Sequence, residues 1–303
     1  MGRHTRTFHS HMWDLALDDY LRLYQLGVIG LLRNTSQIFY VDPANGSDEN
    51  PGYPFEAPVK TIAHALSLVE SERGDFVLLK PSTTVVTEGD ISVAKADLVI
   101  SGLADPNSEL CTINSSSAAT TGIFTLTAAA DRVRIQNLYF NDGTAAKPCI
   151  VTANGATNVE IHNCKFVLTQ DSAIDFDAGA VGDPVIKDCT FQLGDGAGVP
   201  IVMECGTSGG LIEGCTIING INGSGTPPAD GILVKAGTGL IIRNCDIHGG
   251  DAATAYNLVD GIDIDAGVIN TLITRCTIGE CDNAVTDGGT DTTGVTNGVT
   301  ALS

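Results

Sequence analysis

The chain has 303 residues, of which 35 are glycine, and only 5% are aromatic and 17% charged. This composition suits short strands separated by tight turns. The 36 acidic side chains outnumber the 16 Lys and Arg, giving a formal charge of −20. Because nucleic-acid binding depends on cations that neutralise phosphates, this charge argues against a nucleic-acid partner. No segment approaches the ~18 apolar residues of a membrane span, and no cofactor or metal is expected.

The first residues do not resemble a secretion signal, because acidic residues interrupt the segment that follows Arg3 and Arg6. The nine cysteines are an odd number in a chain much larger than disulfide-stapled secreted domains. We therefore expect synthesis in a cytoplasm, with the thiols reduced.

The first predicted element is a helix over residues 12–33, ending near Gly27. It carries one apolar stripe and further leucines, so it needs burial on several sides. Residues 1–37 are interpreted as an N-terminal helical anchor or trimerisation arm, in which the basic residues contact an acidic partner. The residues expected to act in this way are Arg3, Arg6, Trp13, Leu17, Tyr20 and Tyr24.

Residues 38–96 are predicted to form the entrance to a repetitive fold. A strand at Ile38 leads through a loop rich in Pro and Gly to an amphipathic helix over residues 59–69. Its apolar residues, Ile62, Ala65, Leu66 and Val69, follow the spacing of one helix face. A repetitive stack of strands exposes unpaired edges at its end, so this helix is expected to cap the first coil.

One pattern, roughly Ile-x-Asn-Cys-x-Phe/Ile, recurs six times between Arg134 and Ile278. Its middle position is predicted to form an interior ladder of like residues, comprising Leu138, Cys164, Cys189, Cys215, Cys245 and Cys276. Asn137, Asn163 and Asn244, with Asp188, precede that position and are interpreted as bend residues, because Asn tolerates left-handed backbone. A reduced core ladder is favoured over a metal site, since no CxxC-like spacing occurs.

A second family of strands alternates with the first, and four of its five members end in an x-Gly turn; the members begin at Cys149, Ile174, Ile201, Ile232 and Ile262. Two strands and two turns then make one coil of roughly 25 to 31 residues. The sequence predicts an all-β protein, a right-handed single-stranded parallel β-helix, with coils over 97–285 and a tail over 286–303.

The entrance carries Tyr-Val-Asp-Pro-x-Asn-Gly-Ser-Asp from Tyr40, Lys-Thr-Ile-x-x-Ala-Leu from Lys60 and Gly-Asp-x-Val-x-Leu from Gly74. This order resembles the entrance of the pectate-lyase-like superfamily of right-handed β-helices, over roughly residues 38–285. The resemblance implies the fold, which hosts lyases, hydrolases, phage tailspikes and inert virion components. The motifs expected of polygalacturonases are missing, and Arg243 and Arg275 match no pectate-lyase motif.

In the second strand family the outward positions are predicted to form two columns. Asp177 and Glu204 would lie on adjacent coils at the carboxyl spacing of a retaining glycosidase. The other catalytic candidates are Asp175, Asp263 and Asp265. Solvated carboxylates are the favoured alternative, with Lys235 pairing Glu204 or Asp265 across the ladder. A cation between Asp177, Asp263 and Asp265 is a further alternative.

Ile150, Val202 and Leu233 are predicted to face outward in one column and to form the interface of a homotrimer. Taken together, these features predict a structural protein on the surface of a tailed bacteriophage virion. It would be a capsid decoration protein or short spike, attached to capsid or tail proteins by its N-terminal arm. The alternative is a tailspike that binds or cleaves a host surface glycan.

Overall fold

The computed structural model describes residues 36–141, 147–152, 155–168, 171–194, 197–206, 209–220, 230–250, 257–293 and 299–302. For residues 177–181 and 299–302 only the backbone is described. The predicted N-terminal helix lies outside these ranges, together with Arg3, Arg6, Trp13, Leu17, Tyr20 and Tyr24. Among the described residues, no helix has the length and apolar character needed to cross a bilayer.

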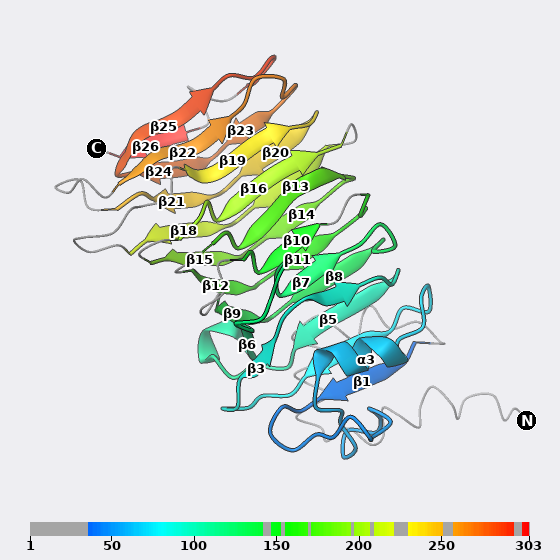
Figure 1. Ribbon diagram of the computed structural model, residues 1–303. Coiled ribbons are helices and arrows are strands. Elements are labelled where there is room, and N and C mark those ends of the chain that lie inside the picture. Colours follow the sequence, from blue (N-terminus) through cyan, green and yellow to red (C-terminus); the bar gives the residue numbers. More distant parts are fainter. Residues whose placement is uncertain are drawn as a thin grey trace, which may run out of the picture.

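The chain winds through three parallel sheets in succession, making a β-solenoid in which each turn adds one strand to each sheet (Figure 1). Sheet A holds β1 (Ile38–Val41), β2 (Phe76–Leu79), β5 (Leu98–Gly102), β8 (Val133–Gln136), β11 (Glu160–His162), β14 (Val185–Lys187), β17 (Gly210–Glu213), β20 (Leu240–Arg243) and β23 (Leu272–Thr274). Sheet B holds β3 (Val86–Glu88), β6 (Thr112–Ser115), β9 (Tyr139–Asn141), β12 (Lys165–Leu168), β15 (Thr190–Leu193), β18 (Thr216–Asn219), β21 (Asp246–His248), β24 (Cys276–Gly279) and β26 (Val299–Leu302). Sheet C holds β4 (Ile91–Val93), β7 (Phe124–Leu126), β10 (Ile150–Thr152), β13 (Ile174–Val181), β16 (Ile201–Cys205), β19 (Asp230–Ala236), β22 (Leu258–Ile264) and β25 (Cys281–Asp287). The predicted parallel β-helix is confirmed.

Each coil has three strands, not the two that the sequence predicted. The sequence predicts one strand for the recurring pattern, whereas the pattern divides between sheets A and B, as β8 and β9 do on either side of Asn137. Asn137 has φ 56°, a left-handed conformation that bends the chain. Asn163, Asp188 and Asn244 adopt the same conformation in later coils, with φ of 46°, 53° and 56°. The bend lets Ile135, Leu138 and Phe140 all point inward, although strict alternation would not.

The interior is filled by columns of like side chains. Phe140, Phe166 and Phe191 stack with ring centroids 4.9 and 5.0 Å apart, and their planes are nearly parallel. Beside them Leu138, Cys164, Cys189, Cys215, Cys245 and Cys276 occupy equivalent positions and are at most 2% exposed. Every described cysteine is a free thiol. Burial raises the pKa of the Cys189 thiol well above its usual value, so this thiol is protonated at neutral pH.

Helix α3 (Ile62–Leu68) covers the first coils, contacting β1, β2 and β4. The predicted apolar stripe is buried, with Ile62, Ala65, Leu66 and Val69 each at most 5% exposed. The helix begins after Thr61, whose hydroxyl accepts from the His64 amide at 3.1 Å. Glu88 of the next coil accepts from the Ile62 and Ala63 amides at 2.8 and 3.0 Å. The capping helix is therefore bound to the stack through the N–H groups of its first turn, which have no partner within the helix.

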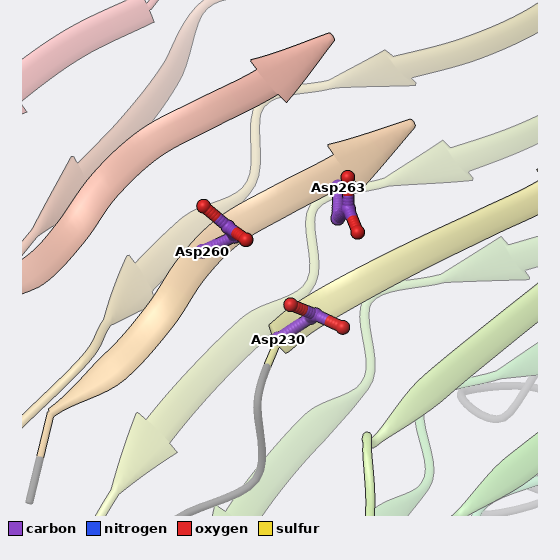
Figure 2. Close-up of side chains that lie close together, drawn as sticks. All are labelled: Asp230, Asp260 and Asp263. Atoms are coloured by element: carbon purple, nitrogen blue, oxygen red, sulfur yellow. The ribbon is translucent and has the colours of Figure 1, made fainter. Parts of the chain in front are cut away.

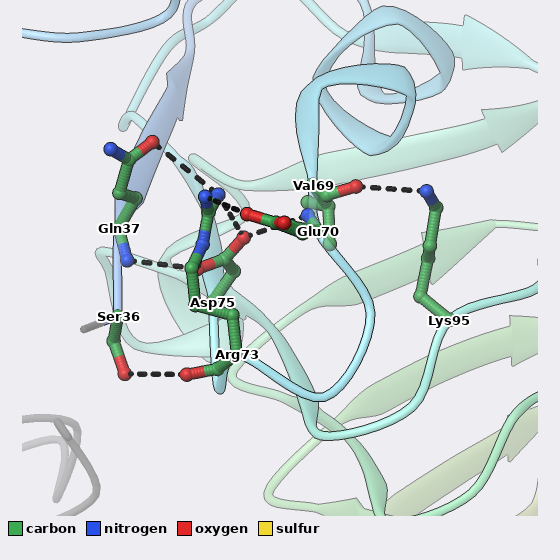
Figure 3. Close-up of polar contacts among 7 residues, drawn as sticks. All are labelled: Ser36, Gln37, Val69, Glu70, Arg73, Asp75 and Lys95. Carbon is green, nitrogen blue, oxygen red and sulfur yellow. Dashed lines mark hydrogen bonds and ion pairs between the residues drawn. The ribbon is translucent and has the colours of Figure 1, made fainter.

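The Gly-Asp motif at residues 74–75 ties the entrance together (Figure 3). Asp75 is 0% exposed, and its carboxylate accepts from the amides of Gln37 and Glu70, both at 2.9 Å. The Arg73 guanidinium donates to the same carboxylate from Nε and Nη2. Four donors surround one buried charge, which is how such a charge is tolerated. Near it, the Lys95 ammonium donates to the Val69 carbonyl at the end of α3, at 2.8 Å.

The stack is longer than the predicted coil range of 97–285. Parallel pairing begins between β1 and β2, and β2 pairs in register with β5. At the other end β22 pairs with β25, and β24 pairs with β26. The predicted entrance and tail therefore contribute strands to the same three sheets.

Candidate functional site

The outward face of sheet C differs from the predicted columns by one residue in β10. Ile150 is in register with Ile174 and Phe124, so it lies in the core with 0% exposure. Placing Ile150 on the outer face was wrong, because a shift of one residue moves a side chain to the other face of a strand. Val151 takes its place, in the same column as Asp175, Val202, Leu233 and Asp263. Val202 is only 7% exposed, so this column is not the open apolar face that was predicted.

The predicted second column is broken at its centre. The pairing of β13 with β16 shifts register after Phe176, and that of β16 with β19 shifts after Met203. Glu204 therefore pairs with Ala236, and Lys235 does not lie opposite it. No register partner joins Asp177 to Glu204, and the Asp177 side chain is outside the described part of the structure. The predicted carboxylate pair is therefore not tested by the described side chains and stays a prediction.

The structure instead brings together three other carboxylates on sheet C, from β19 and β22 (Figure 2). Asp230, Asp260 and Asp263 each offer a carboxylate oxygen, and these oxygens lie within 4.8 Å of one another. Asp230 and Asp260 are direct register partners, with 6% and 8% exposure. Asp263 was a candidate from the sequence; Asp230 and Asp260 were not. Of the other candidates, Asp175 lies two strands away in β13, and Asp265 is exposed beyond the end of β22.

Two glycines bring these carboxylates to one side of the sheet. A Cβ on Gly231 would lie 2.7 Å from the Gly261 carbonyl oxygen, and one on Gly261 would lie 2.4 Å from Ile278 Cγ2. Both glycines therefore face the packed interior, where no side chain fits. Strict alternation would place Asp260 and Asp263 on opposite faces, so the alternation is interrupted between them. The sequence could have indicated Asp230 and Asp260, since the tripeptide Asp-Gly-Ile occurs at 230–232 and again at 260–262.

The electrostatics of the cluster centre on Asp230. Burial raises its pKa to about 7, with further contributions from the charges of Asp263, Asp260 and Asp265. Burial and the neighbouring Asp260 and Asp265 also raise the pKa of Asp263. Asp260 accepts hydrogen bonds from Asn283 Nδ2 at 2.9 Å and Thr286 Oγ1 at 2.5 Å. The cluster thus holds one carboxyl that exchanges its proton near neutral pH, beside a carboxylate fixed by two donors.

Such an arrangement supports two kinds of chemistry. A carboxyl with a pKa near 7 can donate or accept a proton under physiological conditions. Three carboxylates at this spacing also present hard oxygen ligands, although Ca²⁺ takes six to eight oxygens and the cluster by itself offers fewer. Proton transfer is therefore the chemistry that the described residues support more directly.

No protein-family model matches the chain, and no curated protein matches it. Solved structures do. A pectate lyase, Pel9A, is similar at TM-score 0.54 and 17% identity over 81% of this chain, which spans 64% of the lyase chain. A pectin methylesterase from carrot is similar at TM-score 0.51 and 12% identity over 88% of each chain. The chain has the parallel β-helix fold of these enzymes. A protein of Geobacillus virus E2, ORF18, matches 92% of this chain at TM-score 0.38 and 13% identity, and this similarity is too low to support the fold assignment.

Proposed function

We propose that the protein is a structural component of a tailed bacteriophage virion, in which the β-helix is a rigid shaft on the particle surface. Residues 1–37 would anchor the shaft to capsid or tail proteins, and the chain would assemble as a homotrimer. The observation that carries the proposal is the continuity of the stack, since the three sheets run from β1 to β26 with strands paired in sequence throughout the described coils.

This continuity implies stiffness. Each coil hydrogen-bonds to the coils before and after it, and the aromatic and cysteine columns fill the interior between them. A solenoid of this kind is a quasi-one-dimensional object whose coils contact only their neighbours. Such a rod keeps a fixed length and presents its two ends to different partners, which suits a short spike or decoration.

A different face from the predicted one offers an apolar contact surface for the trimer. On the outside of sheet A, four apolar residues stand in one register column on consecutive coils: Val185, Leu211, Ile241 and Leu272. The first three are partly exposed, and Leu272 is 38% exposed. Contiguous apolar columns mark contact faces more often than isolated residues do. We assign the trimer contact to this sheet A stripe.

Mass measurement of the full chain in solution tests the trimer. Ile241→Lys places a charge in the middle of the stripe and should give monomers. Ile218→Lys is the matched control, because Ile218 is 41% exposed on sheet B, away from the stripe. A trimer that survives Ile241→Lys would reject the stripe, and a monomeric wild-type protein would reject the trimer.

The anchor is tested on particles. Antibody against the β-helix should label intact virions from a lysate of cells that produce the protein. Deleting residues 1–35, which leaves the Gln37 amide on Asp75, should leave a folded shaft that keeps its β-sheet circular dichroism and no longer sediments with particles. Normal attachment of the shortened chain would reject the anchor, and absence of the full chain from particles would reject the virion role.

The Asp230 cluster favours a second candidate function, the cleavage of a polysaccharide along sheet C. A carboxyl with a pKa of about 7 suits a general acid, and the two enzymes that share the fold are named for pectate and pectin. Incubation with these and with bacterial surface polysaccharides, followed by reducing-end and unsaturated-uronate assays, tests it. Asp230→Asn should abolish any product, whereas Asp246→Asn on sheet B should not. Equal product from both variants would exclude the cluster.

A further inference from the structure

A second site lies on the outside of sheet A, on a different face from the carboxylate cluster. It is a cavity of about 360 Å³ that crosses β2, β5, β8 and β11, and its lining includes Phe76, Val99, Arg134 and Glu160. These four residues form one register column over four consecutive coils. Small-molecule sites generally measure roughly 300–1,000 Å³, so the cavity is large enough for a small ligand.

The floor of the cavity changes character along that column. One end is apolar, because Val99 is partly exposed there. Phe76 itself is only 1% exposed and belongs to the buried cluster with Tyr40 and Leu78 against which Val99 packs. The other end is charged, because Arg134 donates through Nε to Glu160 at 2.6 Å. A ligand lying along the column would therefore place an apolar surface on Val99 and polar groups on the next two coils.

One wall of the cavity is formed by the turns that precede these strands. Asp97, Arg132 and Asn158 line it, and each holds a left-handed backbone conformation, with φ of 56°, 54° and 52°. Arg132 donates to both oxygens of Asp97, at 2.7 and 3.1 Å. Asn158 donates to Asp131 at 2.9 Å, and the same carboxylate accepts from Thr157. These bonds fix the planar polar groups in position before any ligand arrives.

The charges that line the cavity balance. Asp97 pairs with Arg132, and Glu160 pairs with Arg134, so the lining carries no net charge. A charged ligand would find no unbalanced charge to compensate its desolvation, and the field of a chain with formal charge −20 repels anions. Hydroxyl groups can donate to these carboxylates and accept from the guanidinium groups at once.

We propose that this cavity binds a neutral saccharide of one or two rings. The C–H face of the ring packs on Val99, and its hydroxyls bond to the Arg134–Glu160 pair and to the Asp97, Arg132 and Asn158 wall. The site is separate from the carboxylate cluster, and it lies on the coils before the sheet A stripe, since Glu160 is the register partner of Val185. It would let a particle-borne β-helix hold a glycan without cleaving it.

The test is isothermal titration of the full-length protein with a panel of neutral mono- and disaccharides, with glucuronate and galacturonate as charged comparisons. Saturable binding of a neutral member is expected. Arg134→Ala should raise its Kd by about tenfold or more, since it removes a charged hydrogen-bond donor. Asn158→Gly should also weaken binding, and it keeps the left-handed backbone without strain. Arg243→Ala is the matched control, because Arg243 pairs with Glu213 on the same sheet outside the cavity.

Each result decides the proposal. Weakening in Arg134→Ala and Asn158→Gly, with no change in Arg243→Ala and unchanged circular dichroism in all three, supports it. Binding of the uronates alone would overturn the assignment of a neutral ligand. Neutral binding that is unaffected in both cavity variants would place the site elsewhere, and absence of saturable binding across the panel would reject the site.

Discussion

The buried Asp75 carboxylate gives the sharpest test of how the entrance is held to the stack. In Asp75→Ala the Gln37 and Glu70 amides lose their acceptor, and the Arg73 guanidinium keeps only Glu70 and the Gln37 side chain. Removing one partner of a buried ion pair costs about 3–5 kcal/mol, and an orphaned buried donor costs about 1–3 kcal/mol. The Arg73 side chain is 19% exposed and can regain some water. We therefore expect a loss of about 3–5 kcal/mol in all.

The control comes from the same network. Glu70 also pairs with Arg73, but its side chain is 69% exposed, so Glu70→Ala should cost about 0–1 kcal/mol. Urea unfolding followed by circular dichroism measures both variants. Because coils of a solenoid can open separately, amide exchange at Val77 and Leu78 should accelerate in Asp75→Ala before exchange in β17 does. Equal unfolding free energies for the two variants would refute the assignment of the stabilisation to the buried charge.

Three further predictions concern the cluster, the bends and the ladder. Because the folded-state pKa of Asp230 is raised to about 7, above the ~3.9 of an unfolded Asp, the folded state binds the extra proton. The stability that Asp230 contributes is therefore present at low pH and is lost as pH rises from about 4 to about 7. In Asp230→Asn the free energy of unfolding, measured with urea at several pH values, should fall less over this range. An unchanged pH dependence would contradict the raised pKa. Asn163 has φ 46°, and its side chain donates to Asn137 at 2.8 Å. Asn163→Ala should lower the free energy of unfolding by about 1–2 kcal/mol, and Asn163→Gly should lower it less. Equal melting temperatures for the two variants would exclude backbone conformation as the cause. The buried thiols of Cys164, Cys189 and Cys215 should resist a thiol reagent until the protein unfolds, and rapid labelling of the native protein, located by mass spectrometry, would show that the ladder is open.

The sheet C cluster and the sheet A cavity differ in the charge that they present to a ligand. The cluster concentrates negative charge, and one member responds by retaining its proton near neutral pH. The cavity is lined by two acidic and two basic side chains, which form ion pairs with one another between neighbouring coils. The two faces of one solenoid are therefore suited to different chemistry, and variants in one should leave the other unaffected, because they lie on separate sheets.

The sequence by itself determined the fold, the capping helix and the interior ladder. Parallel stacking repeats one environment in every coil, so a requirement for burial appears as a repeated residue type, and the column from Cys164 to Cys276 could be read directly. The bend residues Asn137, Asn163 and Asn244 could be read for the same reason, since left-handed backbone restricts the choice of residue.

Only the tertiary structure decided which side chains share the outer face. One residue of register moved Ile150 into the core, and shifts in pairing separated Glu204 from Lys235. The Asp230 cluster depends on glycines pressed against the interior, and the sheet A cavity depends on turns from four coils lying side by side. These features arise from small local departures from a regular repeat. Alternation of apolar and polar residues does not encode them, because the outer positions carry no burial requirement that would repeat along the chain.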